Sequence, residues 1–110
     1  TGFTDVTPGM KIFQEEIFGP VVSVIGYRDE DDAARKANDS VYGLAGAVFS
    51  QDPEKAYAFA RRMRAGNMSV NSMIVDITMP FGGFKQSGQG REGGIEGLEN
   101  YLETKSIHMG

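Results

Sequence analysis

The sequence predicts an α/β fold with a largely parallel sheet of βαβ units. Strand-like and helix-like segments alternate along the chain, which is the order that right-handed βαβ crossovers require. The run Val21–Ile25 is rich in β-branched residues, a pattern typical of a strand buried on both faces. A length of 110 residues is that of a single domain, and 40% hydrophobic with 24% charged residues excludes a wholly disordered chain.

Two strands and a helix are predicted in the first part of the chain. Residues 3–6 and 21–25 are the strands. Acidic residues at positions 29–32, followed by Arg35-Lys36, predict a helix from about Glu30 to Asp39, because this order of charges complements the helix dipole.

A strand over residues 44–49 and a helix beginning at Asp52-Pro53 come next. Asp is a good N-cap residue, and proline is favoured at the first helical position. We expect the arginines within residues 61–64 to lie in the last turn and Gly66 to be the residue that follows the C-cap. The apolar stripe of this helix, which we assign to the core, consists of Ala56, Phe59, Ala60 and Met63.

The last part of the chain is expected to be less regular. Residues 69–71 indicate the edge of a third strand, and an irregular stretch covers 72–94. A final helix from about Ile95 to Leu102 and a strand from Thr104 to Met109 close the chain, so that His108 is expected to be an ordinary strand residue.

Composition and charge exclude several classes of function. Eleven basic and 15 acidic residues give a net charge of −4, which argues against nucleic acid or an anionic membrane as the main partner. No apolar run approaches the ~20 residues needed to span a bilayer, and no signal peptide opens the chain. A cytoplasmic location is therefore expected, and the start at Thr1 suggests a piece of something longer.

The sequence contains no cysteine and one histidine. It therefore offers no disulfide, no thiolate metal site and no cysteine nucleophile. A single His108 can supply neither a histidine-based triad nor a multi-histidine metal site. We predict no metal site, and any reactive cysteine or histidine system must lie elsewhere.

A glycine-rich stretch over residues 82–94 is the first candidate for chemistry. Gly88, Gly90 and Gly93 fit the G-x-G-x-x-G dinucleotide fingerprint, but no strand leads into it and no acidic residue follows at the required distance. We instead expect a tight loop whose glycines allow positive φ or close backbone packing. A phosphate-binding loop that uses Lys85 and Arg91 is a weaker alternative.

Two further segments could bind a ligand. Glu15 and Glu16 precede a Gly-Pro break at a strand entrance, where binding residues often sit, although these residues alone favour a solvated turn. The segment 73–79 is apolar yet lies between a strand and a Pro-Gly loop. Such residues either cover a core edge, which the sequence alone slightly favours, or line a pocket.

Three motifs together resemble the aldehyde dehydrogenase superfamily. Residues 15–21 are similar to its EEIFGPV signature, and residues 37–46 to its AN-x(3)-YGL segment. Residues 80–92 match PFGG-x-K-x-SG-x-GRE at every fixed position. The resemblance extends from about Phe3 to residues 103–106, which is essentially the whole chain.

This resemblance implies oxidation of an aldehyde to a carboxylic acid with NAD or NADP. In the family, a cysteine thiolate attacks the aldehyde, hydride passes to the nicotinamide, and a glutamate-activated water hydrolyses the thioester. The family's cysteine, base glutamate, oxyanion asparagine and Rossmann domain lie upstream of the matched segment. The resemblance thus implies the C-terminal part of a catalytic domain over residues 1–103 and an oligomerisation strand over 104–110.

The resemblance also assigns roles to individual residues. Glu16 is expected to bind the hydroxyls of the nicotinamide ribose, and Phe18 to pack beside the nicotinamide ring. Phe81 is expected to face the aldehyde tunnel with Met73 and Ile77 from the variable loop. Backbone carbonyls at Lys85 and Gly88 hold a monovalent cation in some family members, and we do not expect that here.

Two hypotheses for function follow. In the first, the chain is a segment of an aldehyde dehydrogenase that is active only with the remainder of the full-length enzyme. Its substrate is then a small-molecule aldehyde, and a homodimer or homotetramer is expected. In the second, it is a non-catalytic truncated homologue that acts as an interaction module. The aldehyde and the choice between NAD and NADP stay open.

Overall fold

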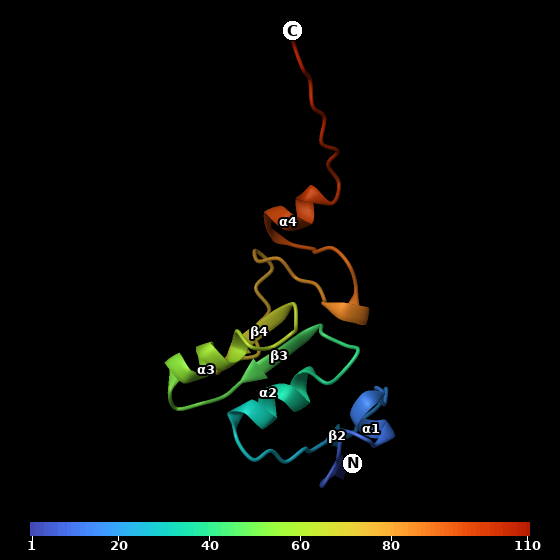
Figure 1. The fold of residues 1–110 in the computed structure, drawn as a ribbon, viewed down its shortest axis with the longest axis vertical. Helices are drawn as coiled ribbons and strands as arrows, with labels where there is room; N and C mark the ends of the chain where they lie inside the picture. Colours follow the sequence, from blue (N-terminus) through green and yellow to red (C-terminus); the bar gives the residue numbers. More distant parts are fainter.

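The computed structural model describes residues 1–110 and has a mixed α/β fold with parallel strands (Figure 1). Short elements alternate along the chain, as the sequence predicts. In order they are β1 (Gly2–Phe3), α1 (Lys11–Gln14), β2 (Val22–Ser23), α2 (Glu30–Asn38), β3 (Ala45–Val48), α3 (Pro53–Ala60), β4 (Asn67–Val70), the 3-10 turn η1 (Lys85–Ser87) and α4 (Gly94–Glu99).

The strands form two separate parallel pairs. β1 pairs with β2, and β3 pairs with β4 in a register that runs from Ala45–Asn67 to Val48–Val70. The expected parallel direction is confirmed, and α1 and α3 are the crossovers within the two pairs. The helix α2 connects one pair to the other instead of joining two neighbouring strands, so the chain holds two small sheets and no continuous one.

Local capping signals fix where α2 and α3 begin. The side chain of Asp29 accepts a hydrogen bond from the Asp32 amide at 2.8 Å, and α2 spans 30–38 against the expected 30–39. Asp52 caps α3 by accepting from the amides of residues 54 and 55, both at 3.1 Å, and Pro53 is the first helical residue.

The predicted end of α3 is wrong. The helix ends at Ala60, so the arginines of 61–64 lie beyond its last turn and Gly66 does not follow its C-cap. The reason is a contact distant in sequence. The Asn38 side chain donates to the Arg62 carbonyl at 2.9 Å and accepts from the Arg64 amide at 2.7 Å, which takes these backbone groups out of the helical pattern.

Few side chains are buried within this chain. The expectation that Val21–Ile25 is buried on both faces is wrong here: Val22 is 59% exposed and Val24 52% exposed, because β2 has β1 as its only neighbour. Half of the predicted α3 stripe, Ala56 and Ala60, is buried. The full set of buried residues is Val6, Asp32, Ala34, Gly43, Ala56, Ala60, Gly83 and Gly97.

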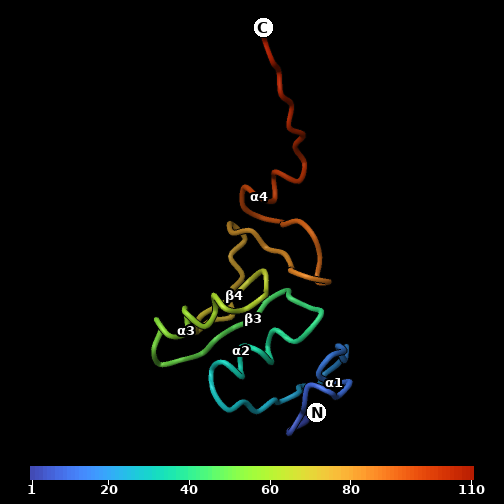
Figure 2. Tube along the Cα trace, viewed as in Figure 1, coloured from blue at the N-terminus to red at the C-terminus, as the bar shows by residue number.

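The end of the chain differs from the expectation. α4 spans 94–99 instead of 95–102, and no strand forms over Thr104–Met109, so His108 is not a strand residue here. Figure 2 shows the chain beyond α4 running away from the rest of the molecule. A strand needs a partner for its backbone hydrogen bonds, and no strand of this chain lies beside the tail.

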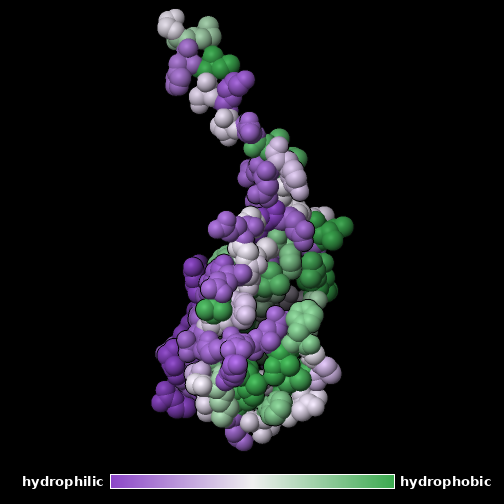
Figure 3. Space-filling model, turned by 90° about the vertical axis from the view of Figure 1, so that its right-hand side faces the viewer, coloured by the Kyte–Doolittle hydropathy of each residue, from purple (hydrophilic) through white to green (hydrophobic).

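The surface is divided by polarity. In Figure 3, hydrophobic residues gather along one side of the body of the molecule and hydrophilic residues along the other. None of the helices has both the length and the apolar character needed to cross a membrane.

Candidate functional site

The segment 15–20 leaves α1 and forms two tight turns. The amide of Gly19 donates to the Ile17 carbonyl at 2.8 Å, and that of Val21 donates to the Gly19 carbonyl at 2.7 Å. These turns hold Phe18 outward, and its side chain is 96% exposed. Phe18 therefore presents a free aromatic face to whatever lies beside this segment.

The two adjacent glutamates differ in their contacts. Glu15 forms an exposed pair with Lys11 at 3.7 Å. The carboxylate of Glu16 makes no hydrogen bond or ion pair with any residue of the chain. Both oxygens of Glu16 are thus free to accept hydrogen bonds from a ligand.

Glu16 lies at a cavity of about 550 Å³ between α1, α2, β3 and the turn after α3. Apolar groups from β3 and α3, such as Val48 and Phe59, line one part of it. Polar lining residues include Glu15, Glu16, Asn38, Ser40, Arg64 and Ser87.

A second cavity of about 700 Å³ was not anticipated from the sequence. It lies between the two strand pairs and is lined mainly by apolar side chains of β3, α2 and α3, with Lys36 and Lys55 among them. The β-branched run 21–25 predicted that apolar groups would cover this strand on both faces. Two of its residues, Ser23 and Ile25, line this cavity.

The glycine-rich loop is the tight, closely packed turn that its composition predicts. Gly88, Gly90, Gly93 and Gly94 have φ between +59° and +135°. Phe81 and Glu92 pair at its base through two backbone hydrogen bonds of 2.7 and 2.8 Å. No strand leads into this loop, so the dinucleotide fingerprint is rejected as the sequence indicates.

Both cations of the loop are occupied by backbone carbonyls. Lys85 Nζ donates to the carbonyls of Asn38 and Ser40 at 2.8 and 2.9 Å. The Arg91 guanidinium donates to the carbonyls of Gly83 and Gly90 at 3.0 and 2.6 Å. Because both cations already donate to the protein's own carbonyls, the hypothesis that the loop binds phosphate is less favoured.

The three residues expected to line a tunnel are not gathered at either cavity. Met73 is 81% exposed and Ile77 is 86% exposed, while Phe81 is partly buried at the base of the loop. Neither cavity includes them or Phe18. Within this chain, then, the expected cofactor residues and tunnel residues stand apart.

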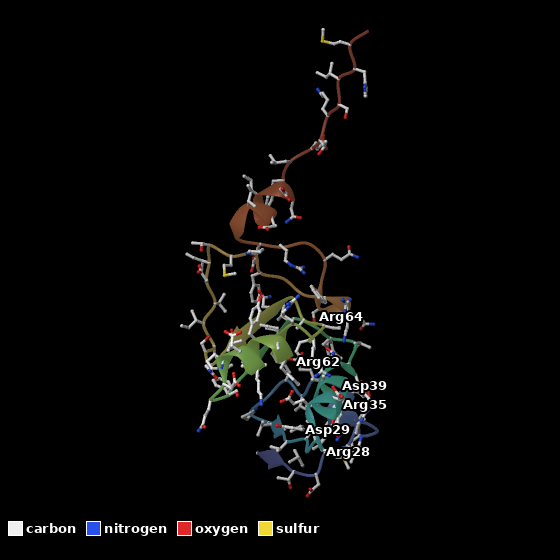
Figure 4. The ribbon with its side chains drawn as sticks, turned by 60° about the vertical axis from the view of Figure 1, so that its left-hand side comes forward. Arg28, Asp29, Arg35, Asp39, Arg62 and Arg64 are labelled. Carbon is white, nitrogen blue, oxygen red and sulfur yellow. The ribbon has the colours of Figure 1, made fainter.

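Two carboxylates have lowered pKa values. Hydrogen bonds from the hydroxyl and amide of Thr78 lower the pKa of Asp76, which lies in the exposed apolar loop next to Ile77. Lys36 is the main cause of the low pKa of Asp32, helped by the Arg28 amide and Arg35. Figure 4 labels Arg28, Asp29 and Arg35 around α2, with Arg62 and Arg64 beyond Asp39.

The chain contains no group of three or more histidine, cysteine, aspartate or glutamate side chains placed to hold a metal ion. The candidate site consists of the free carboxylate of Glu16 and the exposed ring of Phe18. Glu16 lies at the edge of the cavity of about 550 Å³, which is also lined by residues that follow α2.

The comparisons with known proteins converge on one family. The model described as "Aldehyde dehydrogenase family" matches residues 1–107. Aldehyde dehydrogenase [NAD(P)+] 1 of Saccharomyces cerevisiae is 53% identical over 110 residues, which cover 99% of this chain and 22% of the yeast protein.

Solved structures agree. The crystal structure of a Mycobacterium tuberculosis aldehyde dehydrogenase complexed with NAD+ matches with a TM-score of 0.95 and 47% identity, over 99% of this chain and 23% of that one. A mutant aldehyde dehydrogenase of Pseudomonas syringae, in complex with NAD+ and octanal, matches with a TM-score of 0.92 and 49% identity, over 96% of this chain and 22% of that one. The chain thus spans about a fifth of the length of these relatives.

Proposed function

Because the chain belongs to the aldehyde dehydrogenase family, we propose that it forms the C-terminal part of an enzyme that oxidises an aldehyde to a carboxylic acid with NAD+ or NADP+. The observation that carries this proposal is the match of the family model to residues 1–107, a range that contains all three signature motifs. The relatives' names and complexes, with NAD(P)+, NAD+ and octanal, support the same reaction class.

The residues of segment 15–20 fit the nicotinamide half of such a cofactor. Glu16 has two unused carboxylate oxygens, which suit the two hydroxyls of a ribose, and Phe18 offers an uncovered aromatic face two residues away. When bound, NAD(P)+ accepts the hydride that leaves the substrate. The role of Glu16 and Phe18 is to hold the cofactor in place, since neither is suited to attack an aldehyde.

On the substrate side, we propose that Phe81, Met73 and Ile77 form part of an apolar aldehyde tunnel. All three are apolar, and Met73 and Ile77 leave most of their surface uncovered in this chain. Such side chains are available to pack against other parts of a full-length enzyme. They would exclude water from the substrate and select it by shape.

This chain does not supply the nucleophile of the proposed reaction. It contains no cysteine, and covalent attack on the aldehyde requires a thiolate from elsewhere in the full-length enzyme. We therefore assign residues 1–103 to the C-terminal part of the catalytic domain and 104–110 to an oligomerisation strand that joins subunits of a homodimer or homotetramer.

A second candidate function is a non-catalytic interaction module. The observation that favours it is the combination of no cysteine with many exposed apolar side chains, which suit a surface that packs against a partner. The partner in that case would be another protein, and no turnover would be involved.

The test is an assay of the full-length protein that carries this segment, with octanal as substrate and NAD+ or NADP+ as cofactor. We expect reduction of at least one cofactor that depends on the aldehyde. Absence of turnover with both cofactors and a panel of aliphatic and aromatic aldehydes, by a folded protein, would favour the interaction module instead.

A further inference from the structure

Residues 38–43, which we call the junction segment, belong to the second signature motif and make hydrogen bonds on two sides. On one side, Gln14, directly before the EEIFGPV motif, donates from its side-chain amide to the Asp39 carbonyl at 3.1 Å. On the other side, the amides of Phe84 and Gln86 donate to the carbonyls of Gly43 and Val41 at 2.8 and 2.9 Å. The junction segment therefore lies between the expected cofactor residues and the glycine-rich loop.

Side chains strengthen the contact with the loop. The Gly43 amide donates to Ser87 Oγ at 2.9 Å. Gly43 has no room for a side chain, because a Cβ there would lie 2.5 Å from the Arg64 carbonyl oxygen and 3.1 Å from Phe84 Cβ. The junction segment and the loop are thus in direct contact over both backbone and side-chain groups.

Lys85 is the one charged residue that joins the loop to the end of α2. Its Nζ donates to the carbonyls of Asn38 and Ser40, and no carboxylate lies within ion-pair distance of it. A lysine at the end of a helix also interacts favourably with the helix dipole. The Asn38 carbonyl also accepts from the Ser40 amide at 2.9 Å, whereas the Ser40 carbonyl has no donor other than this ammonium.

The backbone of Lys85 is strained. Its φ is +55°, a conformation that is uncommon for residues other than glycine. A strained position persists where its surroundings determine it, and such positions cluster at functional sites. A glycine would relieve the strain here, but it would lose the ammonium that reaches α2.

We propose that Lys85 is a positioning residue that fixes the glycine-rich loop on the junction segment and thereby places Phe81 against the aldehyde. This inference rests on the proposed function, since Phe81 has a substrate role only there. Phe81 lies four residues before Lys85, and between them Gly83 is buried against Ser87, where a Cβ would lie 2.5 Å from Ser87 Cβ. A shift of Lys85 is therefore transmitted to Phe81 through a short, closely packed turn.

The first test compares kinetics in the full-length enzyme. Lys85→Met keeps the length of the side chain and removes its three donors, Lys85→Arg keeps the charge, and Lys55→Met is the matched control, because the Lys55 side chain makes no hydrogen bond or ion pair. For Lys85→Met we expect the KM for octanal to rise about tenfold, with little change in the KM for the cofactor. Lys85→Arg should recover most of the loss, and Lys55→Met should resemble the parent.

The second test measures hydrogen–deuterium exchange in the same four proteins without substrate. Loss of the Lys85 contacts should speed exchange at the amides of Gly43, Phe84 and Gln86, whose bonds join the loop to the junction segment. Lys55→Met should leave these amides as protected as in the parent.

The two tests separate the possible failures. Unchanged exchange at these amides in Lys85→Met would overturn the positioning role whether or not the enzyme oxidises aldehydes. Faster exchange with a uniform loss of active protein and unchanged KM values would make Lys85 a purely structural residue, which also contradicts the inference. A parent that oxidises no aldehyde would contradict the proposed function and the placement of Phe81 against a substrate, while the exchange data would still decide whether Lys85 holds the loop.

Discussion

Asp32 is the charged residue that this fold buries, and its side chain is only 2% exposed. Lys36 Nζ lies 3.0 Å from its carboxylate, Arg35 pairs with it, and the Arg28 amide donates to it at 3.1 Å. These partners hold the pKa of Asp32 well below its usual value. A carboxylate with a lowered pKa in the folded state stabilises that state above the unfolded pKa of about 4. The stabilisation is lost as the pH falls through the lower, folded-state pKa.

We predict that Asp32→Asn lowers the melting temperature of the full-length protein at neutral pH by several degrees, because the side chains of Lys36, Arg35 and Arg28 (the last at 3.6 Å) lose their buried partner. Glu30→Gln, in the same helical turn but without an ion pair, is the control and should melt like the parent. Thermal melts at pH 7 and pH 3 check both points, since the difference between Asp32→Asn and the parent should shrink in acid. Equal melting temperatures of the three proteins at pH 7 would contradict this role.

For Glu16, we expect the effect of substitution to come from lost contacts with the cofactor. In the full-length enzyme, we predict that Glu16→Gln raises the KM for the cofactor about tenfold, which corresponds to one weakened charge-assisted hydrogen bond. The melting temperature should stay near that of the parent, because the Glu16 carboxylate has no partner in this chain. Glu15→Gln, which removes only an exposed pair with Lys11, is the control. Normal kinetics with a large loss of stability would reassign Glu16 to a structural turn.

Among the elements, β4 and the glycine-rich loop meet at a point where the backbones touch. Gly66 donates from its amide to the Gly43 carbonyl at 3.0 Å, and a Cβ on Gly66 would lie 1.7 Å from the Gly82 carbonyl oxygen. The sequence marks Gly66 as a glycine of structural importance, but the reason is this close approach and not the end of α3.

We predict that Gly66→Ala lowers the free energy of unfolding of the full-length protein by roughly 3 kcal/mol, as expected for severe overpacking. Gly26→Ala is the matched control, since a Cβ at Gly26 would meet no atom within 4 Å. Chemical denaturation gives both values. A Gly66→Ala protein as stable as Gly26→Ala would mean that the two backbones can separate without cost.

Residues 104–110, which follow α4, are expected to contribute to subunit association. We expect deletion of residues 104–110 to shift the full-length enzyme towards monomer and to lower its melting temperature, because Ile107 and Met109 are exposed here and need cover from another subunit. Removal of Gly110 alone, which keeps Ile107 and Met109, is the control for a general effect of shortening the chain. Light scattering that returns the parental mass for the longer deletion would indicate that the tail pairs within its own subunit.

The elements also differ in how well the sequence predicts them. The starts of α2 and α3 follow from Asp29, Asp52 and Pro53, because capping acts between neighbours in sequence. The end of α3 depends on Asn38, more than 20 residues away, and no local pattern reports that contact. At the candidate site, the roles of Glu16 and Phe18 are predictions from motif resemblance, whereas the contacts of Lys85 with residues 38 and 40 required the tertiary structure.

For the whole molecule, the dominant property is uncovered apolar surface. Only eight of 110 residues are buried, and Phe18, Met73 and Ile77 are almost fully exposed. The β-branched and apolar residues that predicted a buried parallel sheet are therefore mostly exposed, because this chain alone provides few side chains to cover them.

We predict that the isolated 110-residue chain oxidises no aldehyde, because it lacks the cysteine that the reaction needs. The check is an assay of the purified chain with octanal and each cofactor, beside the full-length enzyme at equal molar concentration. Turnover by the isolated chain, shown to be free of host enzymes, would require a nucleophile that the proposed mechanism does not contain.

The unit β3–α3–β4 is expected to fold before the rest of the chain. Its ladder, its crossover helix and the buried Ala56 and Ala60 all fall within residues 45–70, and α3 packs on both strands. These contacts close shorter loops than the contacts of the glycine-rich loop with residues 38–43, so we expect this unit to form before those contacts do. During synthesis this unit is complete once Val70 has left the ribosome, before the glycine-rich loop has emerged. Changes within it should therefore slow folding, whereas changes in the loop should mainly speed unfolding.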